Sequence, residues 1–160
     1  MTVQTSVDLR YRQALPGVLA DISPMEKASF KADFSNIGFG VAVVRVDDNS
    51  ARVPSVTGQE FLGITIRVLD RENSAVGSNL SLYRQHEIMG VVRRGRIFVK
   101  TPLVAVAPGQ PVYFYHTANV GFLPGDFSNV ADPGFSDLAA NCTWDQTAAA
   151  GEISIIRLNT

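Results

Sequence analysis

The chain has 160 residues, of which 46% are hydrophobic and 18% are charged, and its formal net charge is −1 at pH 7. This length favours one domain with a core that needs no disulfide or metal, and the single Cys142 cannot form an internal disulfide. The near-zero charge gives no general attraction to nucleic acid or to an acidic membrane, and we expect no export signal or membrane-spanning segment.

Residues 1–36 show no sustained hydrophobic period, although residues 7–12 alternate as a short strand would. Pro16-Gly17 and Pro24 mark turns, and any helix would be short and lie within residues 16–30. The segment has too many apolar residues to leave in water, namely Leu15, Val18, Leu19, Ile22, Met25, Phe30 and Phe34. We therefore expect an extended N-terminal arm that packs over the domain or reaches a neighbour. A mobile terminus is the alternative.

The next stretch predicts three strands. Residues 38–46 are almost continuously apolar, which indicates a strand covered on both faces. The polar residues 47–50 predict a turn, and residues 52–56 predict a short return strand that Pro54 places at a sheet edge. Residues 58–69 alternate strongly enough to predict another strand, and the polar residues 70–79 predict a loop.

A short strand at residues 80–84 precedes the most regular part of the chain, residues 87–100 (EIMGVVRRGRIFVK). Two β-branched runs are separated there by Arg93, Arg94 and Gly95. A short break that contains glycine between two such runs predicts a β-hairpin. We therefore expect a hairpin with its turn at Gly95 in the centre of the domain.

The remaining third of the chain continues this pattern. We expect strands at residues 102–107, 112–116, 138–144 and 152–158, a turn at residues 108–111, and a long loop at residues 121–135. About eight to ten short strands with regular turn signals predict an all-β fold, either a sandwich or a jelly-roll-like barrel. The predicted division is an arm over residues 1–36 and a β domain over residues 37–160.

No motif for catalysis or cofactor binding emerges. His86 and His116 are far apart in sequence, and Asp47-Asp48-Asn49 lacks the spacing of a calcium loop, so a hairpin turn is favoured. Gly38-Phe39-Gly40 lacks the third glycine of a dinucleotide site. Cys142 lies among apolar residues without a paired histidine, which favours a buried, inert thiol. We therefore expect no enzyme activity, no metal and no cofactor.

Charge clusters suggest partner contacts instead. Residues 84–100 hold five basic side chains against Glu87 alone, whereas residues 126–152 hold five acidic side chains and no Lys or Arg. The basic turn could bind phosphates or an acidic protein surface. Tyr113, Phe114 and Tyr115 could form a stacking platform, so an OB-like binder of single-stranded nucleic acid is one alternative.

Five blocks of sequence, in order, resemble tailed-phage capsid cement proteins, also called head decoration proteins. These are residues 38–43 (GFGVAV), residues 61–67 (FLGITIR), Tyr83 followed by residues 89–99 (MGVVRRGRIFV), residues 106–113 with Gly121-Phe122, and Trp144-Asp145 with residues 150–158 (AGEISIIRL). The resemblance covers about residues 37–158.

This resemblance implies a structural virion protein that binds the outside of the assembled icosahedral head and bridges major capsid proteins. It implies a homo-oligomer, a dimer or a trimer, that is assembled in the host cytoplasm, with no catalytic residue and no nucleic-acid or membrane partner. A β-module associated with the tail or a fibre is the other alternative. Candidate contacts with the capsid or another partner are Arg10, Tyr11, Arg12, Arg93, Arg94 and Arg96.

Overall fold

A computed structural model of the chain describes residues 15–20, 25–34, 36–68 and 82–159. These residues form strands, turns and bends, with no helix among them, which confirms the all-β prediction. The strands are β1 (Glu26–Ala32), β2 (Ile37–Gly38), β3 (Ala42–Arg45), β4 (Ser50–Arg52), β5 (Phe61–Thr65), β6 (Leu82–Tyr83), β7 (Ile88–Lys100), β8 (Pro111–Tyr115), β9 (Phe127–Ser128), β10 (Ser136–Trp144) and β11 (Ile153–Leu158).

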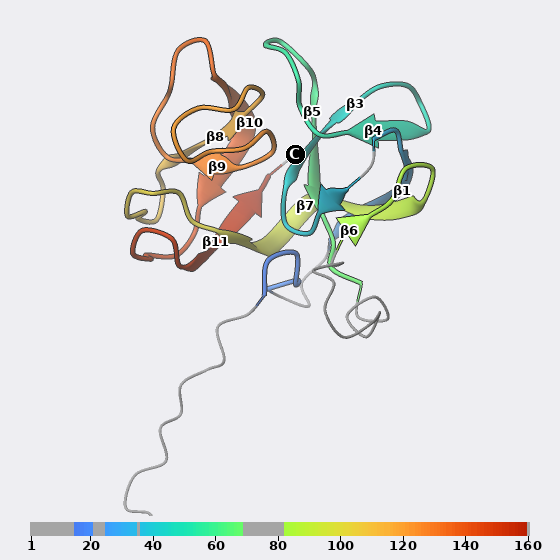
Figure 1. The fold of residues 1–160 in the computed structure, drawn as a ribbon. Coiled ribbons are helices and arrows are strands. Elements are labelled where there is room, and N and C mark those ends of the chain that lie inside the picture. Colours follow the sequence, from blue (N-terminus) through green and yellow to red (C-terminus); the bar gives the residue numbers. More distant parts are fainter. Residues whose placement is uncertain (1–14, 21–24, 35, 69–81, 160) are drawn as a thin grey trace, which may run out of the picture.

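Nine strands are hydrogen-bonded in the order β1-β4-β3-β5-β7-β11-β10-β8-β9, and β7 is shared by two sheets within this series. An additional pairing between β1 and β7 closes the first five of these strands into a barrel. The second sheet runs from β7 through β11 and β10 to β8 and β9. Figure 1 shows the result as two lobes, with the barrel on the right and the β8–β10 lobe on the left. Strands β2 and β6 form a separate pair.

Strand β7 corrects the predicted central hairpin. Residues 88–100 form one continuous strand, and Gly95 lies within it at φ 129°. The first half of β7 pairs with β1 and β5, and the second half, from Gly95 onward, pairs with β11. A side chain at Gly95 would meet Met25, since its Cβ would lie 2.8 Å from the Met25 Cγ. The glycine therefore allows a bend that passes the strand from one sheet to the other.

Two apolar cores lie on the two faces of the shared strands. Val43 and Val91 pack in the cluster inside the barrel, together with Phe30 of β1. Their neighbours Val44 and Val92 point the other way, into the cluster between the barrel and the second lobe. This is the alternation that a strand covered on both faces requires. It explains why residues 38–46 and 88–92 read as continuous apolar runs.

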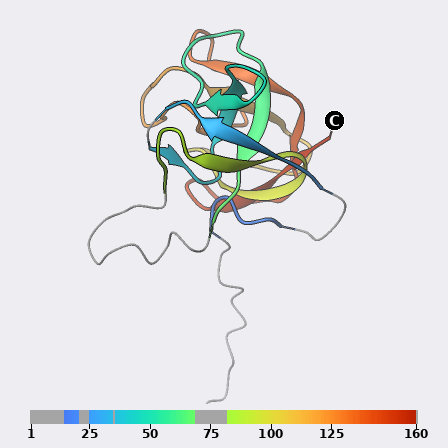
Figure 2. The same cartoon turned by 90° about the vertical axis from the view of Figure 1, so that its right-hand side faces the viewer.

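The predicted arm, residues 1–36, lies partly outside the described residues, and its role stays a prediction. Residues 26–32 belong to the barrel as β1, which pairs antiparallel with β7 and parallel with β4. Figure 2 shows β1 in blue crossing the front of the barrel beside the yellow-green β7. The sequence signal for β1 is weak because two of its three inward-facing residues are alanines. The short helix considered for residues 16–30 does not occur among the described residues of that range.

Residues 15–20 cover the second half of β7. The backbone N–H of Gly17 donates to the Phe98 carbonyl at 2.7 Å, and the N–H of Phe98 donates to the Val18 carbonyl at 2.9 Å. The same segment meets the turn that splits the expected strand 38–46 into β2 and β3. A Cβ at Gly40 would lie 2.6 Å from the backbone nitrogen of Gly17. Two backbones therefore approach each other at a distance that no side chain permits.

We expect Gly40→Ala to destabilise the fold through this contact. Gly40 has φ 69°, and Gly109 has a similar φ of 82° but no atom near its position for a Cβ. Gly109→Ala therefore measures the free-energy cost of placing alanine at a positive φ without any close contact. The control should cost about 1 kcal/mol, and Gly40→Ala should cost at least about 2 kcal/mol more because backbone atoms must separate. Urea unfolding measures both free energies, and equal losses would show that the Gly17–Gly40 contact is unimportant.

Candidate interaction surface

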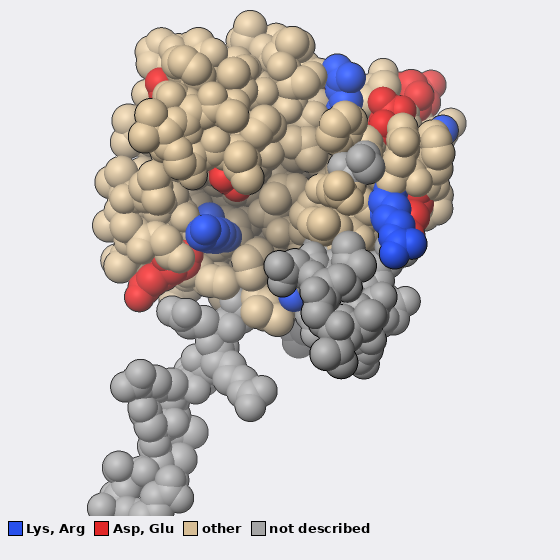
Figure 3. Space-filling model, in the orientation of Figure 1, with Lys and Arg blue, Asp and Glu red and all other residues tan. Residues whose placement is uncertain are grey.

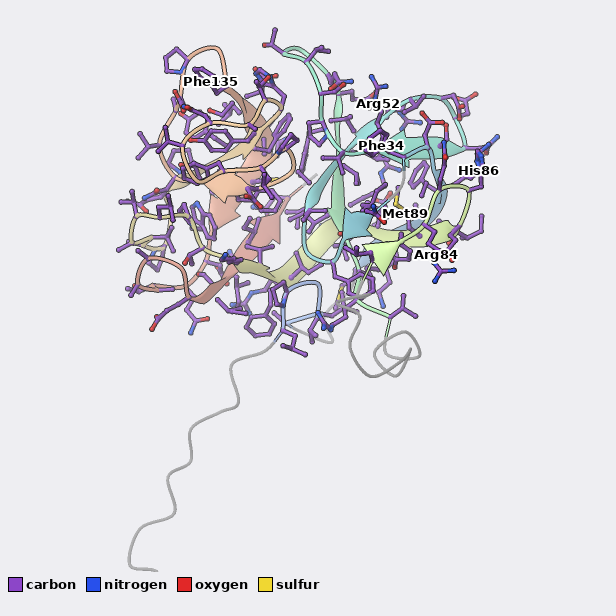
Figure 4. The ribbon with its side chains drawn as sticks, viewed as in Figure 1. Phe34, Arg52, Arg84, His86, Met89 and Phe135 are labelled. Carbon is purple, nitrogen blue, oxygen red and sulfur yellow. The ribbon has the colours of Figure 1, made fainter. Side chains whose placement is uncertain are left out.

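The residues considered for chemistry do not assemble into a reactive centre. His86 lies exposed in a turn before β7 (Figure 4). His116 lies buried directly after β8, so the two histidines come from different lobes. Among the described residues, no group of three His, Cys, Asp or Glu side chains lies close enough to hold a metal ion. No helix in the described ranges is long and apolar enough to cross a membrane.

The acidic run at residues 47–49 forms the predicted hairpin turn. The backbone N–H groups of Asn49 and Ser50 donate to the Asp47 Oδ1 at 2.8 and 2.7 Å. Hydrogen bonds from the Ser50 side chain and from the Asn49 backbone lower the pKa of Asp47. The carboxylate therefore stabilises the turn between β3 and β4, which is the ordinary role of aspartate in such a position.

Two of the three β7 arginines predicted as partner contacts are ion-paired within the chain. Arg93 lies 3.0 Å from Glu26 of β1, and Arg96 binds Asp145, which also holds Arg157 at 2.8 Å. Arg94 is exposed on β7. Because β7 is a bent strand, these residues do not project from a hairpin tip. Arg10, Tyr11 and Arg12 lie outside the described residues, and a partner contact through any of the six stays a prediction.

The three aromatic residues of β8 do not form a stacking platform. Phe114 and Tyr115 are buried, and Phe114 stacks on Phe61 of the barrel with ring centroids 5.3 Å apart. Only Tyr113 is partly exposed. The feature that favoured a binder of single-stranded nucleic acid therefore serves the core instead.

The most distinctive surface comes from a segment whose charge pattern the sequence analysis overlooked. Residues 101–125 contain no Asp, Glu, Lys or Arg. They expose Leu103, Val104, Val120 and Leu123, with Val120 86% exposed, and we call these four residues the apolar face. A Cβ at Gly121 would lie 2.7 Å from Leu103, so the two parts of the segment are neighbours. Figure 3 shows that the visible side of the β8–β10 lobe carries few charged side chains.

The turn that presents Val120 is firmly braced. Asn119 and Phe122 exchange backbone hydrogen bonds of 2.6 and 3.2 Å, and the Phe122 ring stacks on Tyr115 at 4.2 Å. Asp132 accepts hydrogen bonds from the Tyr115 hydroxyl and from the Asn119 side chain. Burial, followed by the charge of Asp132, raises the pKa of Tyr115, so the phenol stays protonated and donates. The exposed valine therefore stands on a rigid support.

Comparisons with known proteins point to one family. A family model described as structural cement protein (E217 gp24/Pam3 gp6) matches residues 3–159. Among solved structures, a chain from "The capsid of Myoviridae Phage XM1" has the same fold with a TM-score of 0.74 and 17% sequence identity. That alignment covers 100% of this chain and 99% of that chain. No curated protein sequence matches the chain.

The thiol of Cys142 is buried, as predicted. It lies in β10, within the core between the lobes, and burial raises its pKa from 9.0 to about 12. The nucleophilic thiolate is therefore almost absent near neutral pH.

We expect the native protein to resist Ellman's reagent at pH 8 and also at pH 10, where an unfolded thiol is largely ionised. In concentrated guanidinium chloride one thiol per chain should react quickly at pH 8. Rapid modification of the native protein at pH 8, measured by absorbance at equal protein concentration, would contradict the burial of Cys142.

Proposed function

The chain belongs to the phage structural cement protein family and is a virion protein that stabilises the capsid, and on that premise we propose how it does so. It binds the outer surface of the assembled icosahedral head and bridges neighbouring major capsid proteins. The observation that carries this proposal is the family match over nearly the whole chain. The role is structural rather than catalytic, and the protein acts as a homo-oligomer, a dimer or a trimer, without a nucleic-acid or membrane partner.

The apolar face supplies a suitable contact with the major capsid protein. Fully burying a valine or leucine side chain contributes roughly 1.5–3 kcal/mol. Four such residues therefore offer useful affinity, and the turn that presents Val120 is already braced before binding. Symmetry repeats the contact over the head, so weak individual contacts suffice for stable attachment. We infer that assembly takes place in the host cytoplasm.

The predicted arm contributes a second contact. Residues 15–20 and β1 are bound to the barrel, so the part available to reach a neighbour is residues 1–14. Arg10, Tyr11 and Arg12 lie in this part and could bind an acidic surface of a neighbouring subunit, as could Arg94. A segment of 14 residues spans up to about 46 Å when fully extended.

We expect the purified protein to co-sediment with heads of the parent phage that lack it, at a saturating and fixed ratio to the major capsid protein. Heads that carry it should survive heating longer. Sucrose-gradient centrifugation with quantitative gel analysis measures the ratio. A discrete soluble oligomer that does not bind heads would contradict the proposal and favour a tail or fibre role.

The same assay tests the apolar face. Val120→Glu places a charge at the most exposed apolar position and should weaken head binding by roughly tenfold or more, because the carboxylate must lose its water. Ile88→Glu is the matched control, since Ile88 is 65% exposed on the barrel side. Equal binding of both variants to heads would show that the apolar face does not form the contact with the head.

Deletion of residues 1–14 tests the arm. The truncated chain keeps all the described strands, so its thermal unfolding should match that of the full chain. We expect weaker binding to heads or a smaller oligomer, measured by co-sedimentation and analytical ultracentrifugation. If both properties are unchanged, residues 1–14 have no arm function.

A further inference from the structure

A cavity of about 390 Å³ lies where the barrel meets the β8–β10 lobe. Its apolar walls include Phe34, Val53, Pro54 and Pro124, and its polar lining includes Arg52 and His116. Among the residues that the structure describes, no acidic side chain lines it. Figure 4 shows Phe34 and Arg52 near one another at the barrel side of this junction. The volume is within the usual range for binding pockets of about 300–1,000 Å³.

Arg52 ends β4 and is partly buried. Among the described residues, no carboxylate lies within ion-pair distance of its guanidinium, and its Nε atom is buried without a hydrogen-bond partner. Other arginines of the protein are paired, for example Arg45 with Glu60 at 3.1 Å and Arg157 with Asp145 at 2.8 Å. A partly desolvated guanidinium without a counter-ion is unfavourable, and an anion in the cavity would relieve that cost.

His116 provides a second group without a complete set of partners. Its side chain is almost fully buried, with 4% of the residue exposed, and its Nδ1 lies 2.9 Å from the Thr117 hydroxyl. Its Nε2 is buried without a partner. When the Thr117 hydroxyl donates to Nδ1, the proton of the neutral ring lies on Nε2 and can be donated. Arg52 and His116, which come from opposite lobes, therefore line one cavity together with apolar side chains and the hydroxyl-bearing Ser55 and Thr117.

We propose that this cavity binds an acidic side chain of a neighbouring virion subunit, presented in an extended segment beside an apolar residue. The carboxylate lies by Arg52 and His116, and the adjoining apolar side chain packs against Phe34, Val53 and the two prolines. The guanidinium of Arg52 can bind a planar carboxylate through two parallel hydrogen bonds, and the apolar lining suits the side chain next to that carboxylate. The assignment to a virion subunit rests on the proposed function, but recognition of the carboxylate does not.

The test uses the isolated protein and two peptides, acetyl-Leu-Glu-Leu-amide and acetyl-Leu-Gln-Leu-amide. We expect the glutamate peptide to shift the NMR signals of the Arg52 Nε–H and the His116 ring saturably, with at least tenfold tighter binding than the glutamine peptide. Equal shifts with both peptides, or no shift at these two residues, would overturn the proposal.

Arginine variants complete the test. Arg52→Gln should abolish the difference between the two peptides, and Arg52→Lys should retain part of it. Arg45→Gln is the control, because Arg45 lies on the neighbouring strand but already has a partner in Glu60. Thermal unfolding confirms that each variant is folded.

Head binding is then measured separately. If Arg52→Gln weakens binding to heads, the acidic segment belongs to a capsid subunit. If Arg52→Gln changes only the oligomeric state of the free protein, the acidic segment belongs to a second copy of this chain. Its assignment to a capsid subunit is then wrong. If the wild-type protein fails to bind heads but discriminates between the peptides, the proposed function fails and the carboxylate site stands.

Discussion

The fold depends on one strand that belongs to two sheets. Strand β7 has hydrogen-bonded neighbours on both edges along its length, with β1 and β5 beside its first half and β11 and residues 17–20 beside its second half. Its side chains also contribute to both cores, through Val91 inside the barrel and through Val92, Ile97 and Val99 between the lobes. Because buried backbone groups need partners, neither sheet can shift without breaking bonds in the other. The two lobes are therefore held in one fixed arrangement.

This constraint also shows where sequence reasoning stops. The alternating runs correctly placed strands near β5, β8, β10 and β11, since burial on one or both faces leaves a local pattern. A glycine between two apolar runs, however, is compatible with a turn and with a bend. The choice at Gly95 depends on the pairing of the second half of β7 with β11, more than fifty residues away in sequence. Strand β1 is also hard to predict from the sequence, because its alanine and lysine residues leave no clear alternation of large apolar and polar side chains.

The candidate interaction surfaces were harder to predict from the sequence than the strands. A charge-free run is present in the sequence at residues 101–125, but the sequence cannot tell whether its leucines and valines form core or surface. The exposed tip at Val120 depends on Asp132, which binds both Tyr115 and Asn119 across the lobe. The basic residues of β7 were conspicuous in the sequence, yet Glu26 and Asp145 neutralise Arg93 and Arg96. Pairing partners distant in sequence thus decide which groups remain available.

The apolar face and the cavity are linked by one short piece of chain. Val120 and Leu123 belong to the face, and Pro124 lines the cavity. Gly125 comes directly after Pro124, and its backbone is hydrogen-bonded to both lobes. Its N–H donates to the Tyr115 carbonyl at 2.8 Å, and its carbonyl accepts from Ala42 of the barrel at 2.9 Å. Since this segment cannot move independently of either lobe, subunits that bind the two surfaces would be held at a fixed spacing. A rigid spacer of this kind is what a protein needs if it is to bridge capsid subunits rather than merely coat them.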